Sequence, residues 1–238
     1  MKRLFTSPLL LAAAIALAAG STSALADQGT YLNSDQIDLS NVLAPPPALN
    51  SARQKADLAR VLEVQRTRTP EQVANAKADL SKSVFRFADV LGPSFNEANL
   101  PKTAALFDAA GKDAAMVAKG GKRYFKRPRP FVTNSDVHPT VPTNPKGYYG
   151  SYPSGHATYG YMSAILLAQM VPEKRAQIFA RGREFGQNRI VDGVHYPSDI
   201  EAGRIDGTLI ATALIQNPKF ERDFAAAKAE VRAKLGLN

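Results

Sequence analysis

The chain has 238 residues, of which 45% are hydrophobic and 21% are charged, with 16 glycines and 16 prolines. This ordinary globular composition excludes a collagenous, a coiled-coil and a wholly disordered protein. Lys and Arg number 30 against 21 Asp and Glu, so the formal net charge is +9. Because cysteine is absent, a disulfide framework, a cysteine zinc site and a thiol nucleophile are excluded as well.

The first 26 residues have the pattern of a secretory signal peptide. Lys2 and Arg3 precede an apolar run over residues 9–19, and Ala24-Leu25-Ala26 matches the small-x-small pattern at which signal peptidase cleaves. A membrane anchor is the alternative, but it needs about 20 apolar helical residues. We therefore expect cleavage after Ala26 and location in a bacterial periplasm, where a protein without disulfides is permitted. The mature chain, residues 27–238, then carries a charge of +7, because Lys2 and Arg3 are lost.

The first half of the mature chain is predicted to be irregular and then helical. Residues 27–47 look irregular and end in a proline-rich segment. Ser51 is expected to cap a helix that runs to about Thr67. Thr69-Pro70-Glu71-Gln72 is a helix start signal, and Gly92-Pro93 ends the apolar pattern that follows it. One core-facing helix is expected between them, with its apolar positions at Val73, Ala76, Leu80, Val84, Phe87 and Leu91.

Helical patterns also fill the second half of the chain, and alternating strand patterns are nearly absent. The predicted helices cover residues 101–118, 158–170, 172–189, 198–215 and 219–235. Residues 128–153 are rich in Pro, Asn, Gly and Tyr and are expected to be non-helical; loops of that length in compact domains are usually functional. We therefore expect an all-α fold with a single domain and no membrane span.

A basic cluster precedes this loop, with five cations in the eight residues from 122 to 129. One interpretation is a solvated basic turn. The alternative is that Lys122 and Arg129 converge on an anion. Arg presents a planar fork that matches two phosphate oxygens, and Lys adds a compact charge.

The second cluster, Pro153-Ser154-Gly155-His156, lies directly before a predicted helix. Its first three residues are also ordinary residues at a loop-to-helix junction. A helix start, however, exposes unpaired backbone N–H groups, and Gly155 would let an oxyanion approach the chain closely. Ser154 can donate its hydroxyl, and His156 is placed to donate a proton.

The third cluster runs from Asn188 to Asp199 and contains Arg189 and His195. Asp199 could accept a hydrogen bond from one ring nitrogen of His195, which would fix the tautomer and direct the other nitrogen outward. Alternatively, Asp199 is only a first-turn acid that the helix dipole favours.

Together, the three clusters predict a site for phosphoryl transfer. Two Arg and one Lys would bind the non-bridging phosphate oxygens and stabilise the transition state. One His would attack phosphorus in line, and the other would protonate the departing oxygen. Because the first His must be neutral and the second protonated, an acidic-to-neutral pH optimum is expected.

In order and internal spacing, the clusters resemble the motifs of the phosphatidic acid phosphatase type 2 superfamily, and within it the bacterial class A non-specific acid phosphatases. These motifs are Lys-x6-Arg-Pro, Pro-Ser-Gly-His and Ser-Arg-x5-His-x3-Asp. Here they are Lys122 to Arg129-Pro130, Pro153-Ser154-Gly155-His156, and Asn188-Arg189 to His195 and Asp199. The resemblance covers most of residues 41–215.

The resemblance implies roles for the residues that match the motifs. His195 would form a phosphohistidine intermediate with support from Asp199, and His156 would be the general acid. The phosphate-binding residues would be Lys122, Arg129, Ser154, Gly155 and Arg189. The family fold is a helical bundle with the active site at helix N-termini and loops at one end. The implied substrates are phosphate monoesters of broad range, and the product is inorganic phosphate. The resemblance implies no metal, no other cofactor and no specific nucleic-acid partner, and it leaves homo-oligomerisation open.

Three residues fall outside this pattern. Asn188 occupies the Ser position of the third motif, so that serine's phosphate contact is not carried over. Asp192 adds an acid near the expected phosphate site, and His138 in the long loop is interpreted as a surface residue. Two other functions stay open. Vanadate-dependent haloperoxidases share the three motifs, and a non-catalytic protein could use the positive charge to hold anions.

Overall fold

The computed structural model describes residues 28–144 and 147–237. The signal peptide expected at residues 1–26 lies outside the described residues, so cleavage and export stay predictions. Within the described ranges, no helix is both long and apolar enough to cross a membrane. No strand forms there either, apart from an isolated bridge between Gln28 and Asn33, so the expected all-α fold is confirmed.

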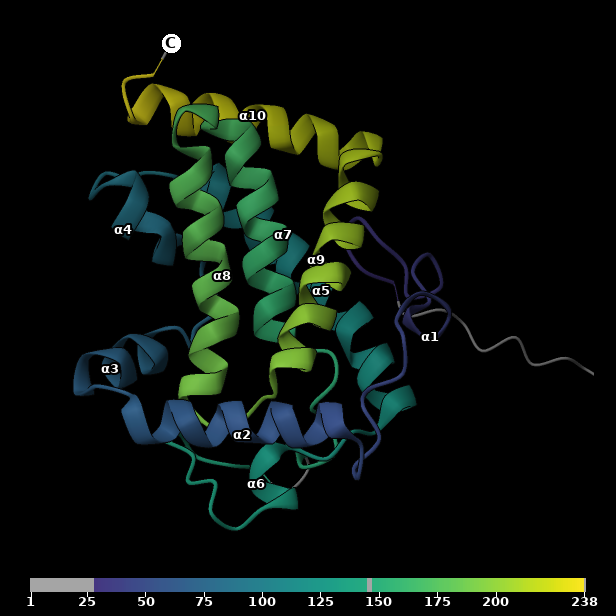
Figure 1. Ribbon diagram of the computed structural model, residues 1–238. Helices are drawn as coiled ribbons and strands as arrows, with labels where there is room; N and C mark the ends of the chain where they lie inside the picture. The colour runs from purple at the N-terminus through teal and green to yellow at the C-terminus, as the bar shows by residue number, and fades with distance from the viewer. Residues whose placement is uncertain (1–27, 145–146, 238) are drawn as a thin grey trace, which may run out of the picture.

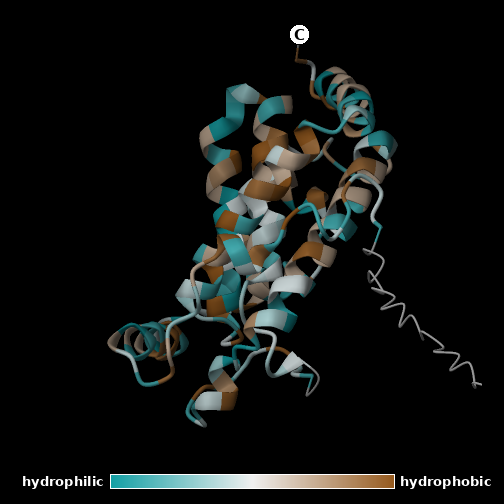
Figure 2. Ribbon diagram, turned by 90° about the vertical axis from the view of Figure 1, so that its right-hand side faces the viewer, coloured by the Kyte–Doolittle hydropathy of each residue, from teal (hydrophilic) through white to brown (hydrophobic). Residues whose placement is uncertain are grey.

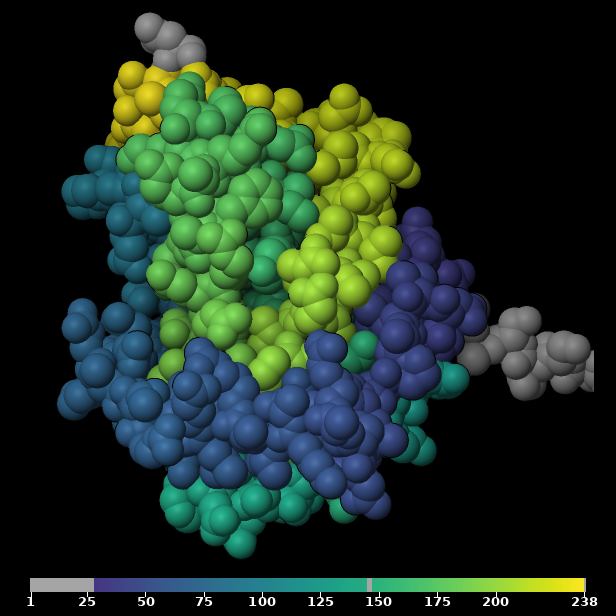
Figure 3. Space-filling model, in the orientation of Figure 1, coloured from purple at the N-terminus to yellow at the C-terminus, as the bar shows by residue number. Residues whose placement is uncertain are grey.

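Three long helices stand side by side and form the centre of the molecule (Figure 1). They are α7 (Gly155–Met170), α8 (Arg175–Val191) and α9 (Pro197–Ile215), with α5 (Pro101–Phe125) packed behind them. At one end of this bundle lies α10 (Pro218–Lys234), and at the other end α2 (Ala52–Thr67) runs across the helix ends. The space-filling view shows α2 as a blue bar over these ends (Figure 3).

Glycines let the central helices approach closely. A Cβ atom on Gly160 of α7 would lie 2.5 Å from the carbonyl oxygen of Gly182 of α8. A Cβ atom on Gly203 of α9 would lie 2.5 Å from the carbonyl oxygen of Ser154, at the start of α7. The backbone N–H of Ser154 also donates to the carbonyl oxygen of Asp199, at 3.0 Å. The N-terminal ends of α7 and α9 are therefore held together.

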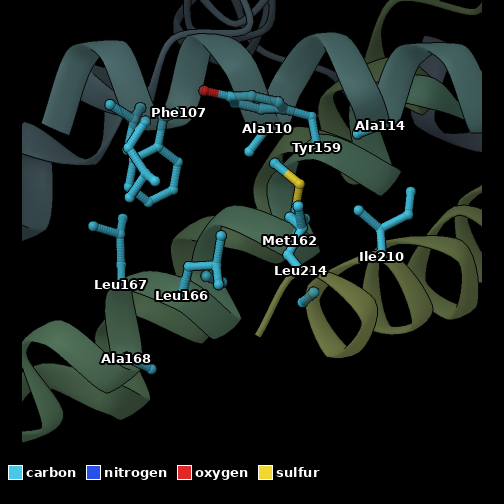
Figure 4. Close-up of a cluster of buried hydrophobic side chains, with 14 of the residues drawn as sticks. Phe107, Ala110, Ala114, Tyr159, Met162, Leu166, Leu167, Ala168, Ile210 and Leu214 are labelled. Carbon is cyan, nitrogen blue, oxygen red and sulfur yellow. The ribbon is translucent and has the colours of Figure 1, made fainter. Parts of the chain in front are cut away.

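The core between these helices is apolar. Phe107 of α5, Met162 and Leu166 of α7, and Ile210 of α9 meet in the cluster of Figure 4, and each is at most 2% exposed. Full burial of one such side chain stabilises the fold by about 1.5–3 kcal/mol. Figure 2 shows the same arrangement, with hydrophobic residues gathered between the helices.

The prediction of a single helix from Pro70 to Leu91 is wrong. The chain forms α3 (Pro70–Ala78), then a break, the 3₁₀ helix η1 (Val84–Phe87) and α4 (Ala88–Leu91). The expected start is confirmed, since Thr69 and Gln72 form a capping box. At the break, Asp79 is 1% exposed and its carboxylate accepts from Arg86, Arg181 and Asn188. Leu80, expected in the core, is 44% exposed.

Other boundaries differ less. Helix α5 extends seven residues beyond the expected end at Ala118, so it includes Lys122. A short helix, α6 (Pro130–Thr133), interrupts the loop expected at residues 128–153, and another, α1 (Leu39–Val42), lies in the segment expected to be irregular. A 3₁₀ turn, η3 (Pro172–Lys174), precedes α8. The helices α2, α9 and α10 begin and end within one residue of the expected positions.

Candidate active site

Four of the predicted site residues line one cavity of about 210 Å³. They come from different elements: Arg129 from the chain before α6, His156 from the first turn of α7, Arg189 from the last turn of α8, and His195 from the link between α8 and α9. The cavity therefore lies at the end of the bundle that α2 crosses (Figure 1). Helix N-termini and loops were expected there, but the C-terminal end of α8 contributes as well.

The ring of His195 is held from both nitrogens. Its Nδ1 lies 3.2 Å from Oδ2 of Asp199, and its Nε2 lies 3.2 Å from Nη1 of Arg129. Because Asp199 can only accept when ionised and Arg129 can only donate, the proton is assigned to Nδ1 and the lone pair to Nε2. Burial, with Arg129 and Lys122 nearby, lowers the pKa of His195 well below its usual value. The imidazole is therefore neutral, and the lone pair that can act as a nucleophile is on Nε2, where it accepts from Arg129 in this structure.

Asp199 is fully buried and is surrounded by donors. Its Oδ2 accepts from Ser151 Oγ at 2.6 Å and from the backbone N–H of Tyr196 at 2.8 Å, and its Oδ1 accepts from Arg127 Nη1 at 2.6 Å. Burial raises the pKa of Asp199, whereas Arg127 and these hydrogen bonds lower it. With this many donors directed at it, the carboxylate is assigned as ionised.

Arg127 is the main residue of this site that motif matching missed. Its guanidinium, 3% exposed, stacks 4.2 Å from the ring centre of Tyr196. Besides Asp199 it donates to Gln54 at 2.5 Å and to Asp57 at 3.1 Å, and both of these residues belong to α2. Arg127 thus connects α2 to the carboxylate behind His195. Its signal in the sequence is the dense Arg-Pro-Arg-Pro run over residues 127–130.

His156 faces the same cavity from the start of α7. Its Nε2 lies 3.2 Å from the carbonyl oxygen of Leu80, which the break after α3 brings to the cavity. Burial, together with the positive charge of Arg189, lowers the pKa of His156 to about 3. With these surroundings His156 is neutral. An anion bound beside it would raise this pKa, because the opposite charge favours the imidazolium.

Arg189 has a donor that is free for a ligand. Its Nη2 donates to the carbonyl oxygen of Ala76, and its Nη1 lies 2.8 Å from Oδ2 of Asp192 without hydrogen-bond alignment. Its Nε has no partner among residues 28–144 and 147–237, although Arg189 is only 1% exposed. A buried, unpaired guanidinium N–H at a cavity wall is suited to bind an oxyanion.

Lys122, Ser154 and Gly155 do not line this cavity. Lys122 lines the adjoining one, where its Nζ donates to the carbonyl oxygen of Gly150 at 2.5 Å. Burial and the nearby Arg129 lower the pKa of Lys122 to about 7. Ser154 is buried and caps α7, its Oγ accepting from the N–H of Ala157 at 3.4 Å. The cap uses Oγ only as an acceptor, so the expected phosphate contact of the Ser154 hydroxyl stays a prediction. Gly155 faces open space, since a Cβ atom there would meet nothing within 4 Å.

The three residues outside the motifs also lie outside the cavity. Asn188, which replaces the motif serine, donates from its side-chain amide to Oδ2 of Asp79 at 2.8 Å. Asp192 accepts from Thr140 Oγ1 and pairs with Arg189. His138 is exposed, as expected, and its backbone N–H donates to Gln65.

Comparison with known proteins agrees with this geometry. Residues 106–223 match the PAP2 superfamily. The non-specific acid phosphatase of Salmonella typhi is 30% identical over 91% of this chain and 89% of that protein. That of Providencia stuartii is 31% identical over 83% and 82%, and an acid phosphatase of Zymomonas mobilis is 34% identical over 79% and 74%.

A bacterial vanadium-dependent iodoperoxidase has a similar fold, with a TM-score of 0.57 and 19% identity. The match covers 73% of this chain and 52% of that chain, and at this identity it shows the fold alone. The acid phosphatase relatives, by contrast, match along most of their length. On these grounds the chain belongs to the PAP2 superfamily.

Proposed function

We propose that this chain, an acid phosphatase of the PAP2 superfamily, hydrolyses phosphate monoesters through a phosphohistidine formed on His195. The observation that supports this most is that His156 and His195 line one cavity together with Arg129 and Arg189. A protein that only binds anions does not need two imidazoles beside two guanidinium groups. Phosphoryl transfer needs both, because one group attacks while another supplies a proton.

In the first step, Nε2 of His195 attacks phosphorus while the bond from phosphorus to the ester oxygen breaks. His156 accepts the proton of the bound monoester monoanion and passes it to the departing oxygen, and an alcohol leaves. Asp199 stabilises the positive charge that appears on the His195 ring, since it lies 3.2 Å from Nδ1. In the second step, water attacks the phosphohistidine, neutral His156 takes the water proton, and inorganic phosphate and free His195 result.

Arg129 and Arg189 stabilise the charge that spreads over the phosphate oxygens during both steps. Arg189 contributes its unpaired Nε. Arg129 lines the catalytic cavity and also the adjoining one, where Lys122 lies. These cations supply the positive charge that many phosphatases take from metal ions, which is why we propose a metal-independent reaction. The residues that line the cavity include Leu80 and Phe131, whose side chains favour no particular leaving group, in keeping with broad specificity.

The test is hydrolysis of p-nitrophenyl phosphate by the mature protein in EDTA. Activity should persist there, should disappear in His195→Ala, and should survive in His138→Ala, the matched control on the surface. Because a phosphohistidine hydrolyses in acid and survives in alkali, rapid quenching in alkaline detergent with a substrate labelled on phosphorus should leave label on the wild-type protein. Loss of activity on chelation, with recovery on adding zinc or magnesium, would overturn the metal-independent mechanism. Location in the periplasm is tested separately, by fractionating cells that express the full chain.

Two other functions give different results in the same preparation. A vanadate-dependent haloperoxidase would oxidise bromide with vanadate and peroxide and would show no phosphatase activity. A non-catalytic anion-binding protein would bind phosphate equally well in wild type and in a variant with both His156 and His195 changed to Ala, and neither would turn over ester.

A further inference from the structure

A second cavity, of about 640 Å³, adjoins the catalytic one and is strongly cationic. Arg129 and Gly147 line both cavities, so the two are neighbours. Of the residues that line this second cavity, the proposed mechanism uses only Arg129 and Lys122. No acidic side chain is found among the described residues that line this second cavity, and its cations are Lys119, Lys122, Arg123, Lys126 and Arg129.

The fold brings these cations together from two directions. Lys119, Arg123 and Lys126 follow one another at four- and three-residue steps along the end of α5, so they share one face of the helix. The chain then turns at Lys126, which has a left-handed backbone with φ of 47°. It returns through Arg129, whose Nε donates to the carbonyl oxygen of Gly147 at 2.8 Å.

The positive charges of this second cavity are not paired with carboxylates. In the part of the chain that the structure describes, none of its five cations forms an ion pair with a carboxylate, whereas Lys112 on the same helix pairs with Asp108 at 2.8 Å. The Nζ of Lys122 donates only to a backbone carbonyl. Cations near a helix C-terminus also offset the helix dipole, and that is the structural alternative for Arg123 and Lys126.

We propose that this second cavity is a subsite for a second phosphate group in the leaving group of the substrate. It would make organic bisphosphates and diphosphates better substrates than simple monoesters. The inference rests on the proposed function, since the scissile phosphate would lie between His156 and His195. Arg129, which lines both cavities, would then lie between the two phosphates and contact both. Multiply charged ligands gain most where several uncompensated cations face one space.

The test compares propyl phosphate with the bisphosphate of 1,3-propanediol, and reads the ratio of their kcat/KM values. Because the bisphosphate carries two equivalent phosphate groups, its kcat/KM is first divided by two. The corrected kcat/KM of the wild type should be about tenfold higher for the bisphosphate than for propyl phosphate, and Lys119→Glu/Arg123→Glu should abolish that difference. The matched control is Arg222→Glu/Lys228→Glu on α10, at the far end of the bundle (Figure 1), which changes the net charge equally. The control should keep the wild-type ratio.

No bisphosphate preference in the wild type, or an equal loss in both charge reversals, would overturn the subsite. The variant Lys119→Gln/Arg123→Gln distinguishes the subsite from a role in offsetting the helix dipole of α5. If these cations only offset the dipole, the variant should unfold at a lower temperature and keep the wild-type ratio of kcat/KM values. If the wild type hydrolyses neither ester, the proposed function fails. The subsite is then judged by calorimetry on His195→Ala, where inorganic diphosphate should bind more tightly than phosphate only while Lys119 and Arg123 are present. Tighter binding of a single-stranded oligonucleotide than of diphosphate would instead assign the cavity to a polymeric anion.

Discussion

Replacing Arg127 by Met tests whether the carboxylate behind His195 depends on a buried counter-ion. Arg127 pairs with Asp199 at 2.6 Å and with Asp57 at 3.1 Å, and all three side chains are at most 4% exposed. Methionine fills a similar volume but leaves both carboxylates without this cation. Removal of one partner from a buried ion pair costs about 3–5 kcal/mol, so we expect a decrease of that size in the free energy of unfolding.

The assay is urea unfolding followed by circular dichroism at pH 7, alongside kcat for p-nitrophenyl phosphate. A matched control is Arg53→Met, because Arg53 lies 3.9 Å from the same Asp57 but is 69% exposed, and such pairs contribute at most about 1 kcal/mol. We expect kcat of Arg127→Met to decrease by about 10- to 100-fold, since His195 loses its fixed orientation. A stability loss no larger than that of Arg53→Met would refute the role assigned to Arg127.

The pH dependence gives an internal check on the same variant. Arg127 is the largest influence that lowers the pKa of Asp199 against burial, so its removal raises that pKa further. A carboxyl whose pKa is raised in the folded state destabilises that state at any pH above the pKa that the group has in the unfolded chain. This destabilisation is lost as the pH falls and the carboxyl becomes protonated. The difference in stability between wild type and Arg127→Met should therefore narrow as the pH falls below about 5. A constant difference would mean that uncompensated charge is not the cause.

Two further predictions concern buried titratable groups. Burial raises the pKa of Asp206 to about 7, so this group should make wild-type stability fall as the pH rises from about 4 to 7, by at most about 4 kcal/mol. Urea unfolding of Asp206→Asn at several pH values should show that this slope is removed. An unchanged slope would contradict the raised pKa. In NMR experiments, added inorganic phosphate should raise the pKa of His156 from about 3 and shift the signals of His195, whereas the signals of exposed His138, which lies outside the cavity, should not move. A response of His138 alone would place phosphate elsewhere.

The convergence of Arg129, His156, Arg189 and His195 could be predicted from the sequence, because motif spacing fixes where these residues lie relative to helix ends. The break after Ala78 could not. Apolar periodicity continues through it, whereas the partners of buried Asp79 include Arg181 and Asn188, more than 100 residues later in the chain. A local pattern does not contain those partners.

Side-chain direction was the other missing information. Spacing predicts that Lys122 lies near Arg129, but not that α5 continues to Phe125 and turns Lys122 toward the second cavity. In the same way, the motif identifies Ser154 without showing that its hydroxyl oxygen caps α7 by accepting from the N–H of Ala157. Both outcomes depend on how far a helix extends, which tertiary packing decides.

The low pKa of His156 has a consequence for the source of the catalytic proton. At about 3, this group is almost entirely neutral in the free enzyme at pH 5 or 6, so it does not bring the proton itself. A phosphate monoester has a second pKa of about 6, and its monoanion carries a proton that a bound, neutral His156 can accept and pass to the ester oxygen.

The alkaline decrease of kcat/KM should therefore follow the ionisation of the substrate, with a tenfold loss per pH unit above about 6. A series of aryl phosphates with different second pKa values tests this, because the decrease should move with each substrate. His156→Gln should lower kcat across the whole range and leave the position of the decrease in kcat/KM unchanged. A decrease fixed at one pH for every substrate would show that an enzyme group supplies the proton, and the pKa of His156 in the free enzyme would then have to lie near that pH.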